Sequence, residues 1–378
     1  MAPGLYLHVP FCSAICSYCT FTRGLFDRDL KTAYVRALAS EIRAAAAQYA
    51  GDSAPPDTIY FGGGTPSLLE PAEIETLVST CAECFGLTAG AEITLEVNPE
   101  TVDEPRLAAF RRAGVTRVSL GVQSFHDEEL RRLGRMHDAA RARRAVHEAR
   151  AAGFDNISVD LMMWLPEQSL ADWLDNVEAL VALAPEHASL YLLELHAGVP
   201  LREHMLARGW SQAPDDDAAA MYEGALERLD AAGYEQYEIS NVARPGHESR
   251  HNQKYWRDGD WLGFGCGAHS SWRGVRWYNV AATTAYVQRL ARGESPVAGR
   301  RVLTPAERFE EAVITGLRLA EGIAPAELAA RYGIDLRERY GTALAPFLEA
   351  GLLVDDGARL RLTRQGMLVA NEVLAVFV

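Results

Sequence analysis

Three cysteines near the start of the chain are spaced for chemistry. Cys12, Cys16 and Cys19 form the pattern C-x3-C-x2-C, and the 378 residues contain six cysteines in all. Such clustering in a long chain indicates metal or redox chemistry rather than a disulfide framework. Three thiolates on one short loop suit a [4Fe–4S] cluster that leaves one iron free for another ligand. A zinc site, with His8 as an awkwardly placed fourth ligand, and simple packing are the alternatives.

A triple glycine follows the second predicted strand, in the run from Gly62 to Pro66. Glycines let backbone groups approach a ligand closely, and Thr65 adds a hydroxyl. The amino and carboxylate groups of S-adenosylmethionine (SAM) can chelate the free iron, and an electron from the cluster can then cleave the neighbouring carbon–sulfur bond. Alone, a triple glycine is more often a tight turn. Its place one strand–helix unit after the cysteines favours a SAM site.

Short β-rich segments and longer helical patterns alternate along the first half of the chain, and they must position these residues. Strand–helix alternation requires crossover connections, and hence a parallel sheet with helices outside. Six repeats fall short of the eight of a closed barrel, so we predict an α/β fold with a partial (β/α)6 barrel. Strands are expected at 5–9, 58–61, 92–97, 117–121, 156–161 and 187–193, and helices at 30–49, 73–85, 139–152 and 169–182.

Polar residues follow the predicted strands where each of them ends. The cysteines follow the first strand and the glycines the second, while Glu96 closes the third. Gln123 follows the fourth strand, and Asp160 lies near the end of the fifth. Because parallel strands place their carboxyl ends on one face, we expect these side chains to converge there.

The remaining chain divides into two further parts. Residues 1–213 form the predicted barrel, and 214–291 form a Trp-, Tyr-, Gly- and His-rich extension with one helix at 218–232. The run 292–296 is expected to be a linker. From 292 to 378, helices precede a hairpin that turns around Asp356-Gly357, which predicts a small winged-helix-like α+β domain.

Several of these motifs together resemble a known family. The chain looks like the radical SAM superfamily, in the branch that holds oxygen-independent coproporphyrinogen III oxidase and the HemW heme chaperones. The resemblance covers essentially the whole chain. The matching segments are YLHVPFC (6–12), CSYC (16–19), FGGGTPS (61–67), EVNP (96–99), GVQSF (121–125), LGRMH (133–137), YEISN (237–241) and HNQKYW (251–256).

The resemblance implies roles for individual residues. Two sets of residues would bind SAM. For Arg135 and Asp160, which belong to the second set, the structural alternative is an ion pair that ties a helix to a strand. The cluster-bound SAM would be held by Tyr6, Gly63, Gly64, Thr65 and Glu96, while Gln123, Arg135 and Asp160 match positions that hold a second SAM in the oxidase.

Three features of the sequence favour the chaperones over the oxidase. The oxidase has a fourth cysteine two residues after the third, where this chain has Phe21. The oxidase also carries an N-terminal extension, which we do not expect here because the chain begins almost at its first strand. The segment 251–256 resembles the H-N-x-x-Y-W signature of HemW proteins. The alternative is a radical SAM enzyme, either a porphyrinogen decarboxylase or a HemN-like methyltransferase; a zinc-binding scaffold is a third class.

The same segment supplies a predicted heme ligand. His251 could offer a ring nitrogen to heme iron, with Tyr255 and Trp256 packing on the porphyrin. A hydrogen-bonded histidine beside aromatic core residues is the structural alternative. His247 and His269 are secondary candidates.

The sequence departs from the family pattern at two places. Trp164 stands where a glycine is common, so backbone shape or pocket volume is expected to differ. Cys266 stands where proline is common, and we interpret it as a packed residue, with a soft iron ligand as the alternative. Cys81 and Cys84, three apart on a predicted helix, are interpreted as structural.

Charge and hydropathy restrict the partners. The chain has 37 basic and 51 acidic residues, a net charge of −14, which disfavours nucleic acid. No apolar run approaches the ~18–20 residues that span a bilayer, and the N-terminus lacks the pattern of a targeting peptide. We expect a soluble cytoplasmic protein that passes heme to an apo-hemoprotein client. Peripheral contact with a membrane-bound client and a homodimer are left open.

Overall fold

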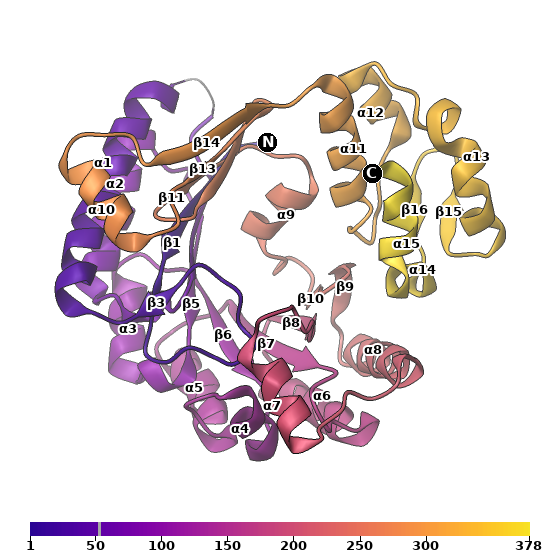
Figure 1. The fold of residues 1–378 in the computed structure, drawn as a ribbon, viewed down its shortest axis with the longest axis horizontal. Coiled ribbons are helices and arrows are strands. Elements are labelled where there is room, and N and C mark those ends of the chain that lie inside the picture. The colour runs from indigo at the N-terminus through magenta and orange to yellow at the C-terminus, as the bar shows by residue number, and fades with distance from the viewer. Residues whose placement is uncertain (52–53) are drawn as a thin grey trace.

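The computed structural model describes residues 1–51 and 54–378. A 12-stranded sheet dominates it, in the order β14-β13-β12-β11-β1-β4-β5-β6-β7-β8-β10-β9. The sheet curls into an open barrel with helices around its outside (Figure 1). The parallel strands after the N-terminus are β1 (Gly4–Val9), β4 (Thr58–Gly63), β5 (Glu92–Val97), β6 (Arg117–Gln123), β7 (Ile157–Met163) and β8 (His187–Leu192).

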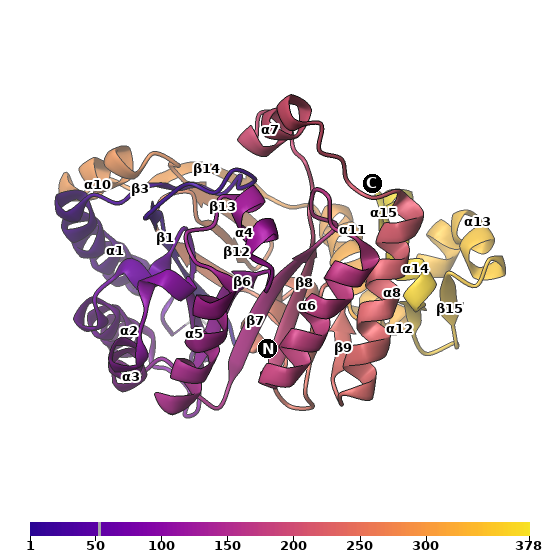
Figure 2. The same ribbon diagram turned by 90° about the horizontal axis from the view of Figure 1, so that it is seen from below.

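The outer helices pack their apolar faces against this sheet, as expected for a partial (β/α)6 barrel. Figure 2 shows these helices after a 90° turn of the view. Their ends carry the side-chain caps that satisfy free backbone groups. Asp27 caps the first helix, and Ser169 forms a capping box with Asp172. The helices are α1 (Arg28–Tyr49), α2 (Pro71–Phe85), α3 (Glu104–Arg112), α4 (Asp127–Leu133), α5 (Ala139–Ala151), α6 (Leu170–Leu183), α7 (Pro200–Arg208) and α8 (Asp215–Ala231).

Strand register builds a polar interior for the barrel. Tyr6 of β1 lies beside Tyr60 of β4, and Asp160 of β7 lies beside Ser189 of β8. Because successive side chains on a strand point to opposite faces, these residues face the barrel interior while their neighbours pack under the helices. The short strands β2 (Phe11–Cys12) and β3 (Gly24–Leu25) form a separate parallel pair outside this sheet.

The middle of the chain extends the sheet at both edges. The strand β11 runs parallel to β1, and antiparallel strands continue the sheet beyond it. The run 292–296 joins α10 to β14, which still pairs with β13 in this sheet. The elements are β9 (Glu235–Glu238), β10 (Asn241–Ala243), α9 (Arg250–Trp256), β11 (Trp261–Phe264), β12 (His269–Trp272), β13 (Val275–Asn279), α10 (Thr283–Ala291) and β14 (Val297–Val302).

A smaller C-terminal unit has its own apolar core around Phe309 and Val313. Its hairpin is antiparallel and turns at Asp356-Gly357, as the sequence predicts. Arg318 pairs with Glu238 of β9 at 3.2 Å and ties the unit to the barrel. The unit consists of α11 (Pro305–Gly316), α12 (Pro325–Tyr332), α13 (Leu336–Glu349), β15 (Leu353–Asp355), β16 (Leu360–Leu362), α14 (Arg364–Leu368) and α15 (Ala370–Leu374).

Candidate functional site

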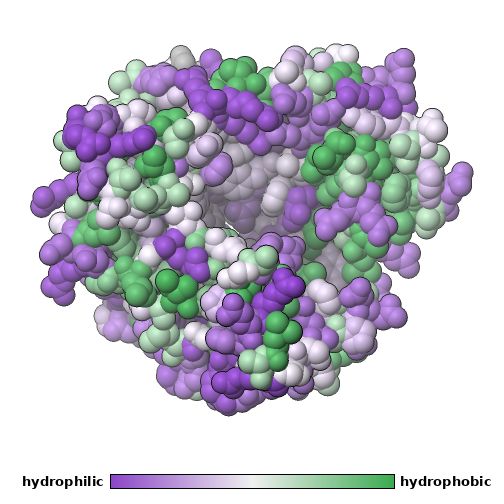
Figure 3. Space-filling model, viewed as in Figure 1, coloured by the Kyte–Doolittle hydropathy of each residue, from purple (hydrophilic) through white to green (hydrophobic). Residues whose placement is uncertain are grey.

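A cavity of about 370 Å³ opens at the carboxyl ends of the parallel strands. The space-filling view shows a hollow in the middle of the molecule (Figure 3). This cluster cavity brings together residues that lie up to 184 positions apart in the chain, between Cys12 and His196. The predicted residues that line it are Cys12, Cys16, Cys19, Gly63, Gly64, Thr65, Glu96, Gln123, Arg135 and Asp160.

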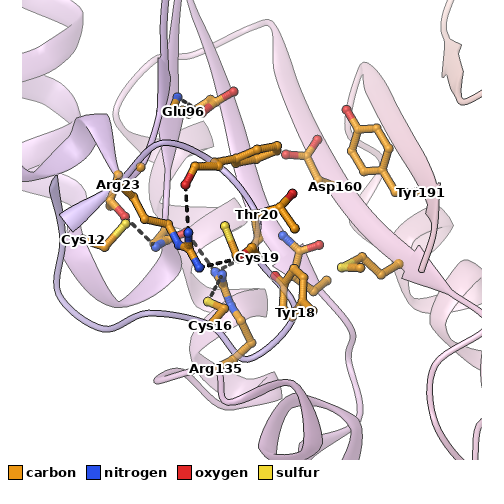
Figure 4. Close-up of a pocket in the computed structure, with 18 of the residues that line it drawn as sticks. Cys12, Cys16, Tyr18, Cys19, Thr20, Arg23, Glu96, Arg135, Asp160 and Tyr191 are labelled. Carbon is orange, nitrogen blue, oxygen red and sulfur yellow. Dashed lines mark hydrogen bonds between the residues drawn. The ribbon is translucent and has the colours of Figure 1, made fainter. Parts of the chain in front are cut away.

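Backbone hydrogen bonds hold the cysteine loop over the cavity. The amide of Gly24 donates to the carbonyl of Pro10 at 2.7 Å, and the amide of Phe26 donates to that of Cys12 at 2.9 Å. The guanidinium of Arg23 reaches back to the carbonyls of Cys19 and Phe21. These bonds fix the course of the loop, and its three sulfurs surround the same space (Figure 4).

The donor set suits a cluster better than a single ion. Among residues 1–51 and 54–378, no three His, Cys, Asp or Glu side chains converge closely enough to hold one metal ion. The three thiols instead line a common cavity. A Cβ at Gly64 would lie 3.0 Å from Cys12 Sγ and 2.8 Å from the Phe11 carbonyl oxygen, so glycine keeps this space open. The residues present fit a [4Fe–4S] cluster held by three cysteines.

The side chain of Glu96 is the acidic centre of the predicted SAM site. Its Oε1 accepts a hydrogen bond from Tyr60 Oη at 2.9 Å, and its Oε2 accepts one from the Gly63 amide at 3.0 Å. Burial raises the pKa of Glu96 to about 7, although both hydrogen bonds oppose the shift. A carboxylate held in this way can accept hydrogen bonds from an ammonium or ribose hydroxyl group in the cavity. Gly63 reaches it with φ at 118°, a conformation that favours glycine.

Arg135 and Asp160 do not pair with each other within the described chain. Arg135 Nη1 lies 3.5 Å from Cys16 Sγ, and its Nη2 donates to Asn98 Oδ1 at 2.8 Å. Asp160 instead accepts a hydrogen bond from Ser119 Oγ at 3.1 Å. Gln123 has φ at 67°, next to the irregularity in β6. The ion pair that was the structural alternative is therefore replaced by separate contacts.

The two remaining predicted residues lie outside this cavity. Tyr6 lines a neighbouring cavity, and its hydroxyl is 3.0 Å from His8 Nδ1. His251 is fully buried, with Nδ1 2.8 Å from Thr58 Oγ1 and Nε2 2.8 Å from Tyr255 Oη. Burial lowers the pKa of His251 to about 3, so its ring is neutral at pH 7. In this arrangement His251 could bind iron only by giving up one of these hydrogen bonds.

Other cavity residues escaped the sequence analysis. Arg23 follows the cysteines by four positions, and a cation so near a thiolate cluster was a signal that could have found it. Asn98 lies in a motif already noted, and its Nδ2 donates to Thr65 Oγ1 at 3.1 Å. Tyr18, within the CSYC segment, also lines the cavity, as do Met162 and Tyr191, which carry no pattern that singles them out.

The two departures from the family pattern have structural explanations. Trp164 has φ at 62°, the conformation that glycine adopts readily, and its indole Nε1 donates to the Ala213 carbonyl at 2.7 Å. The backbone at Trp164 thus keeps the conformation that glycine favours, and the hydrogen bond of the indole fixes the side chain. Cys266 is fully buried, with its Sγ 3.6 Å from Thr283 Oγ1, as the packing interpretation expects. Cys81 is buried in α2, and Cys84 lies on the same helix.

No helix within 1–51 and 54–378 combines the length and apolar character needed to cross a bilayer.

Comparisons with known proteins agree with this geometry. Residues 6–180 match the Radical SAM superfamily, and residues 303–369 match the HemN C-terminal domain. The heme chaperone HemW of Mycobacterium tuberculosis is 40% identical over 375 residues, covering 98% of this chain and 93% of the relative. The heme chaperone HemW of Bacillus subtilis is 33% identical, covering 98% of both chains.

A solved structure shares the fold. The structure of coproporphyrinogen III oxidase (HemN) from Escherichia coli superposes with a TM-score of 0.86 at 24% identity, covering 100% of this chain and 90% of the other. The C-terminal unit described above is therefore the counterpart of a domain found in HemN. With its cysteine loop, glycine-rich strand end and full-length relatives, the chain belongs to the radical SAM superfamily, in the HemW branch beside coproporphyrinogen III oxidase.

Proposed function

We propose that this protein is a cytoplasmic heme chaperone of radical-SAM type, which binds heme and passes it to an apo-hemoprotein. The observation that carries the proposal is the combination of a cavity lined by Cys12, Cys16 and Cys19 with full-length similarity to proteins named heme chaperone HemW. Because those relatives are at least 33% identical over 98% of this chain, the likeness includes the segment 251–256 and the C-terminal unit.

The cluster would be held by the three cysteines, and when bound it supplies an electron and one open iron site. Arg135 places a positive charge at Cys16, and Gly64 keeps the space beside Cys12 free of a side chain. Arg23 maintains the loop by donating to the carbonyls of Cys19 and Phe21. These contacts fix the loop that carries the sulfurs and place a charge beside Cys16.

SAM would lie beside the cluster along the ends of β4 and β5. Gly63, Gly64 and Thr65 would offer backbone groups and a hydroxyl, and the carboxylate of Glu96 would accept hydrogen bonds from the ligand. Asn98 orients the Thr65 hydroxyl. A second SAM at Gln123, Arg135 and Asp160 stays a prediction, and the contact between Arg135 and Cys16 favours a role for Arg135 at the cluster.

The test uses protein reconstituted without oxygen. We expect about four irons and four sulfides per chain, binding of hemin, and transfer of that heme to an apo-cytochrome. A colourless protein with zinc and no labile sulfide would contradict the cluster. Failure to bind hemin, with the cluster intact, would contradict the chaperone function.

A radical SAM enzyme that acts on a porphyrinogen is the second candidate. It is favoured by the fold shared with coproporphyrinogen III oxidase over the whole chain. Against it, Phe21 replaces the fourth cysteine of the oxidase pattern and is 64% exposed at the cavity. Incubation of the same preparation with coproporphyrinogen III or a methyl acceptor distinguishes the two functions. Turnover of either substrate would contradict the chaperone function and support the enzyme. Membrane contact and homodimer formation stay predictions.

A further inference from the structure

The short turn between α4 and α5 is bound to the end of β6 by two of its side chains. Arg135 Nη2 donates to the Gly121 carbonyl at 2.7 Å. Two positions later in the turn, His137 Nε2 lies 3.1 Å from the Val122 carbonyl oxygen. These two partners are neighbours in β6, so the turn contacts the strand at two successive points.

The same two side chains also bind the segment that follows β5. Arg135 Nη2 donates to Asn98 Oδ1 at 2.8 Å, and His137 Nδ1 lies 2.9 Å from Glu100 Oε2. Asn98 directly follows β5, and Glu100 lies in the short 3₁₀ helix η2 (Pro99–Thr101). The turn is therefore held by two parallel sets of contacts, one made by Arg135 and the other by His137.

The segment around η2 is itself fixed from α5. Arg141 Nε donates to the Pro99 carbonyl at 2.9 Å, and its Nη2 donates to the Val102 carbonyl at 2.6 Å. Because these bonds lie on both sides of Glu100, that carboxylate is a fixed anchor. The contact with His137 ties the turn to this anchor.

The partners of His137 determine how many protons its ring carries. The Val122 oxygen is a carbonyl and can only accept a hydrogen bond. Burial raises the pKa of Glu100, but the hydrogen bond from His137 and the charge of Arg135 outweigh it and lower the pKa below its usual value, so this carboxylate also only accepts. The His137 side chain is 0% exposed, which leaves water no access to it. Both nitrogens must then donate, which makes the ring an imidazolium.

No other buried histidine in the part of the chain that the structure describes has two partners that only accept. His187 lies 2.8 Å from two hydroxyl oxygens, one of a serine and one of a tyrosine. His8 and His251 each have at least one hydroxyl partner as well. A hydroxyl can donate or accept, so a neutral ring satisfies these three sites. Only His137 is required to be charged.

We propose that the imidazolium of His137 is a positioning residue, which holds Arg135 against Cys16 and so keeps the cluster easier to reduce. The inference rests on the proposed function, to which the cluster belongs, and names a residue that regulates it. Arg135 Nη1 lies 3.5 Å from Cys16 Sγ (Figure 4), and a cation at a ligand sulfur stabilises the reduced form. A turn released from Glu100 would let this guanidinium move away from the sulfur.

The first test is an anaerobic redox titration of the reconstituted full chain, followed by electron paramagnetic resonance. We expect His137→Phe, which keeps a ring but has no donor, to lower the equilibrium constant for one-electron reduction at least threefold, or by about 28 mV. His147 is an exposed histidine on α5 outside the cluster cavity, and His147→Phe should match wild type. An unchanged potential in folded His137→Phe with an intact cluster would overturn the inference.

Glu100→Leu separates the effect of position from that of charge. Removal of a negative charge near the cluster would by itself raise the reduction potential. Loss of the anchor would instead let Arg135 leave Cys16, and the potential would fall. We expect the same equilibrium constant to fall at least threefold. A rise, or no change, would overturn the positioning role of His137.

A double variant tests whether His137 acts through Arg135. His137→Phe in the background of Arg135→Gln should add no further shift in potential, because the guanidinium that His137 positions is gone. A shift that adds to that of Arg135→Gln alone would assign the effect to the charge of His137 itself, and would overturn the proposal.

Nitrogen-15 NMR of the oxidised wild type tests the charge of the ring. We expect signals from two protonated ring nitrogens of His137, identified by their loss in His137→Phe. A single protonated nitrogen would overturn the imidazolium. Wild type that assembles no cluster would contradict the proposed function instead.

Discussion

The guanidinium of Arg135 lies against the sulfur of Cys16, with Nη1 and Sγ 3.5 Å apart. The two residues are 119 positions apart, and Arg135 reaches the loop from the turn that follows α4. A second contact, from Nη2 to the Gly121 carbonyl at 2.7 Å, holds the guanidinium in place. The cation is thus built into the cluster cavity by the barrel itself.

Replacement of Arg135 by Gln should make the cluster harder to reduce. Reduction adds negative charge, and a cation hydrogen-bonded to a ligand sulfur stabilises the reduced form. We expect the midpoint potential to fall by roughly 50 mV, or about 1.2 kcal/mol for one electron. Anaerobic redox titration followed by electron paramagnetic resonance measures it. Arg131→Gln, on the exposed face of α4, is the control, and equal potentials in the two variants would contradict the role of Arg135.

Alanine at Cys12, Cys16 or Cys19 should abolish cluster assembly. Each variant removes one of three sulfurs that line the cavity, and no other cysteine lines it within the described chain. Iron and sulfide per chain should fall close to zero after reconstitution. Cys84→Ala, on α2, should retain the wild-type content. Loss of the cluster in Cys84→Ala, or its retention in any of the three others, would require a different ligand set.

SAM affinity should rise with pH through the titration of Glu96. The ionised carboxylate is the form that binds a cationic ligand, and its pKa is about 7 because it is buried. The ionised fraction grows from about one tenth at pH 6 to about nine tenths at pH 8, so the apparent Kd should fall about tenfold over this range. Equilibrium dialysis checks this. Glu96→Gln should bind more weakly, with little pH dependence, and a pH dependence like that of wild type would assign the titration to another group.

His251→Ala should destabilise the fold at pH 7. The change removes a fully buried ring and hydrogen bonds to Thr58 and Tyr255, at a cost of about 2–4 kcal/mol. Denaturant unfolding at pH 7 measures the loss, with His147→Ala as the matched control. A loss below 1 kcal/mol would show that His251 does not hold α9 against the sheet.

The same histidine should make the free energy of unfolding depend on pH in the acidic range. Its folded pKa, about 3, is below that of the unfolded chain, so the unfolded state binds more protons between about pH 3 and 6.5. The free energy of unfolding should therefore rise with pH in this window, by up to about 1.4 kcal/mol per pH unit from this group. In His251→Ala this part of the slope should be missing. Parallel stability–pH curves for wild type and variant would contradict it.

Trp164→Gly separates backbone strain from packing. Glycine would relieve the cost of a positive φ, about 1–2 kcal/mol, but would lose the hydrogen bond to the Ala213 carbonyl and the packing of the indole. We expect a net loss of about 1–2 kcal/mol in the free energy of unfolding. A variant more stable than wild type would mean that strain outweighs the anchor.

The barrel strands were predictable because buried parallel strands are apolar and end in distinctive residues. The range expected for the third strand, 92–97, coincides with β5, and the cysteines, glycines and Glu96 meet in one cavity as expected. The strands β11 to β14 were not predictable from local pattern. They are short and rich in Trp, Gly and Arg, and β11 is positioned by pairing with β1 some 250 residues away.

The hydrogen-bond partners of individual side chains also could not be predicted from the local sequence pattern. The burial of His251 depends on Thr58 and on Glu92, whose carboxylate accepts hydrogen bonds from the amides of Arg250 and His251 at 3.0 Å. These contacts span more than 150 residues, so the motif indicated a chemically important segment without revealing which of its groups remain free.

The cluster cavity shares walls with the neighbouring cavity that Tyr6 lines, and these shared walls have a thermodynamic consequence. A ligand in one cavity that displaces Phe21, Gly63 or Glu96 changes the affinity of the other cavity for its own ligand. Linkage makes that influence mutual, with the same factor in both directions. Ligand binding and release in the two cavities are then coupled through these shared residues, without a domain motion.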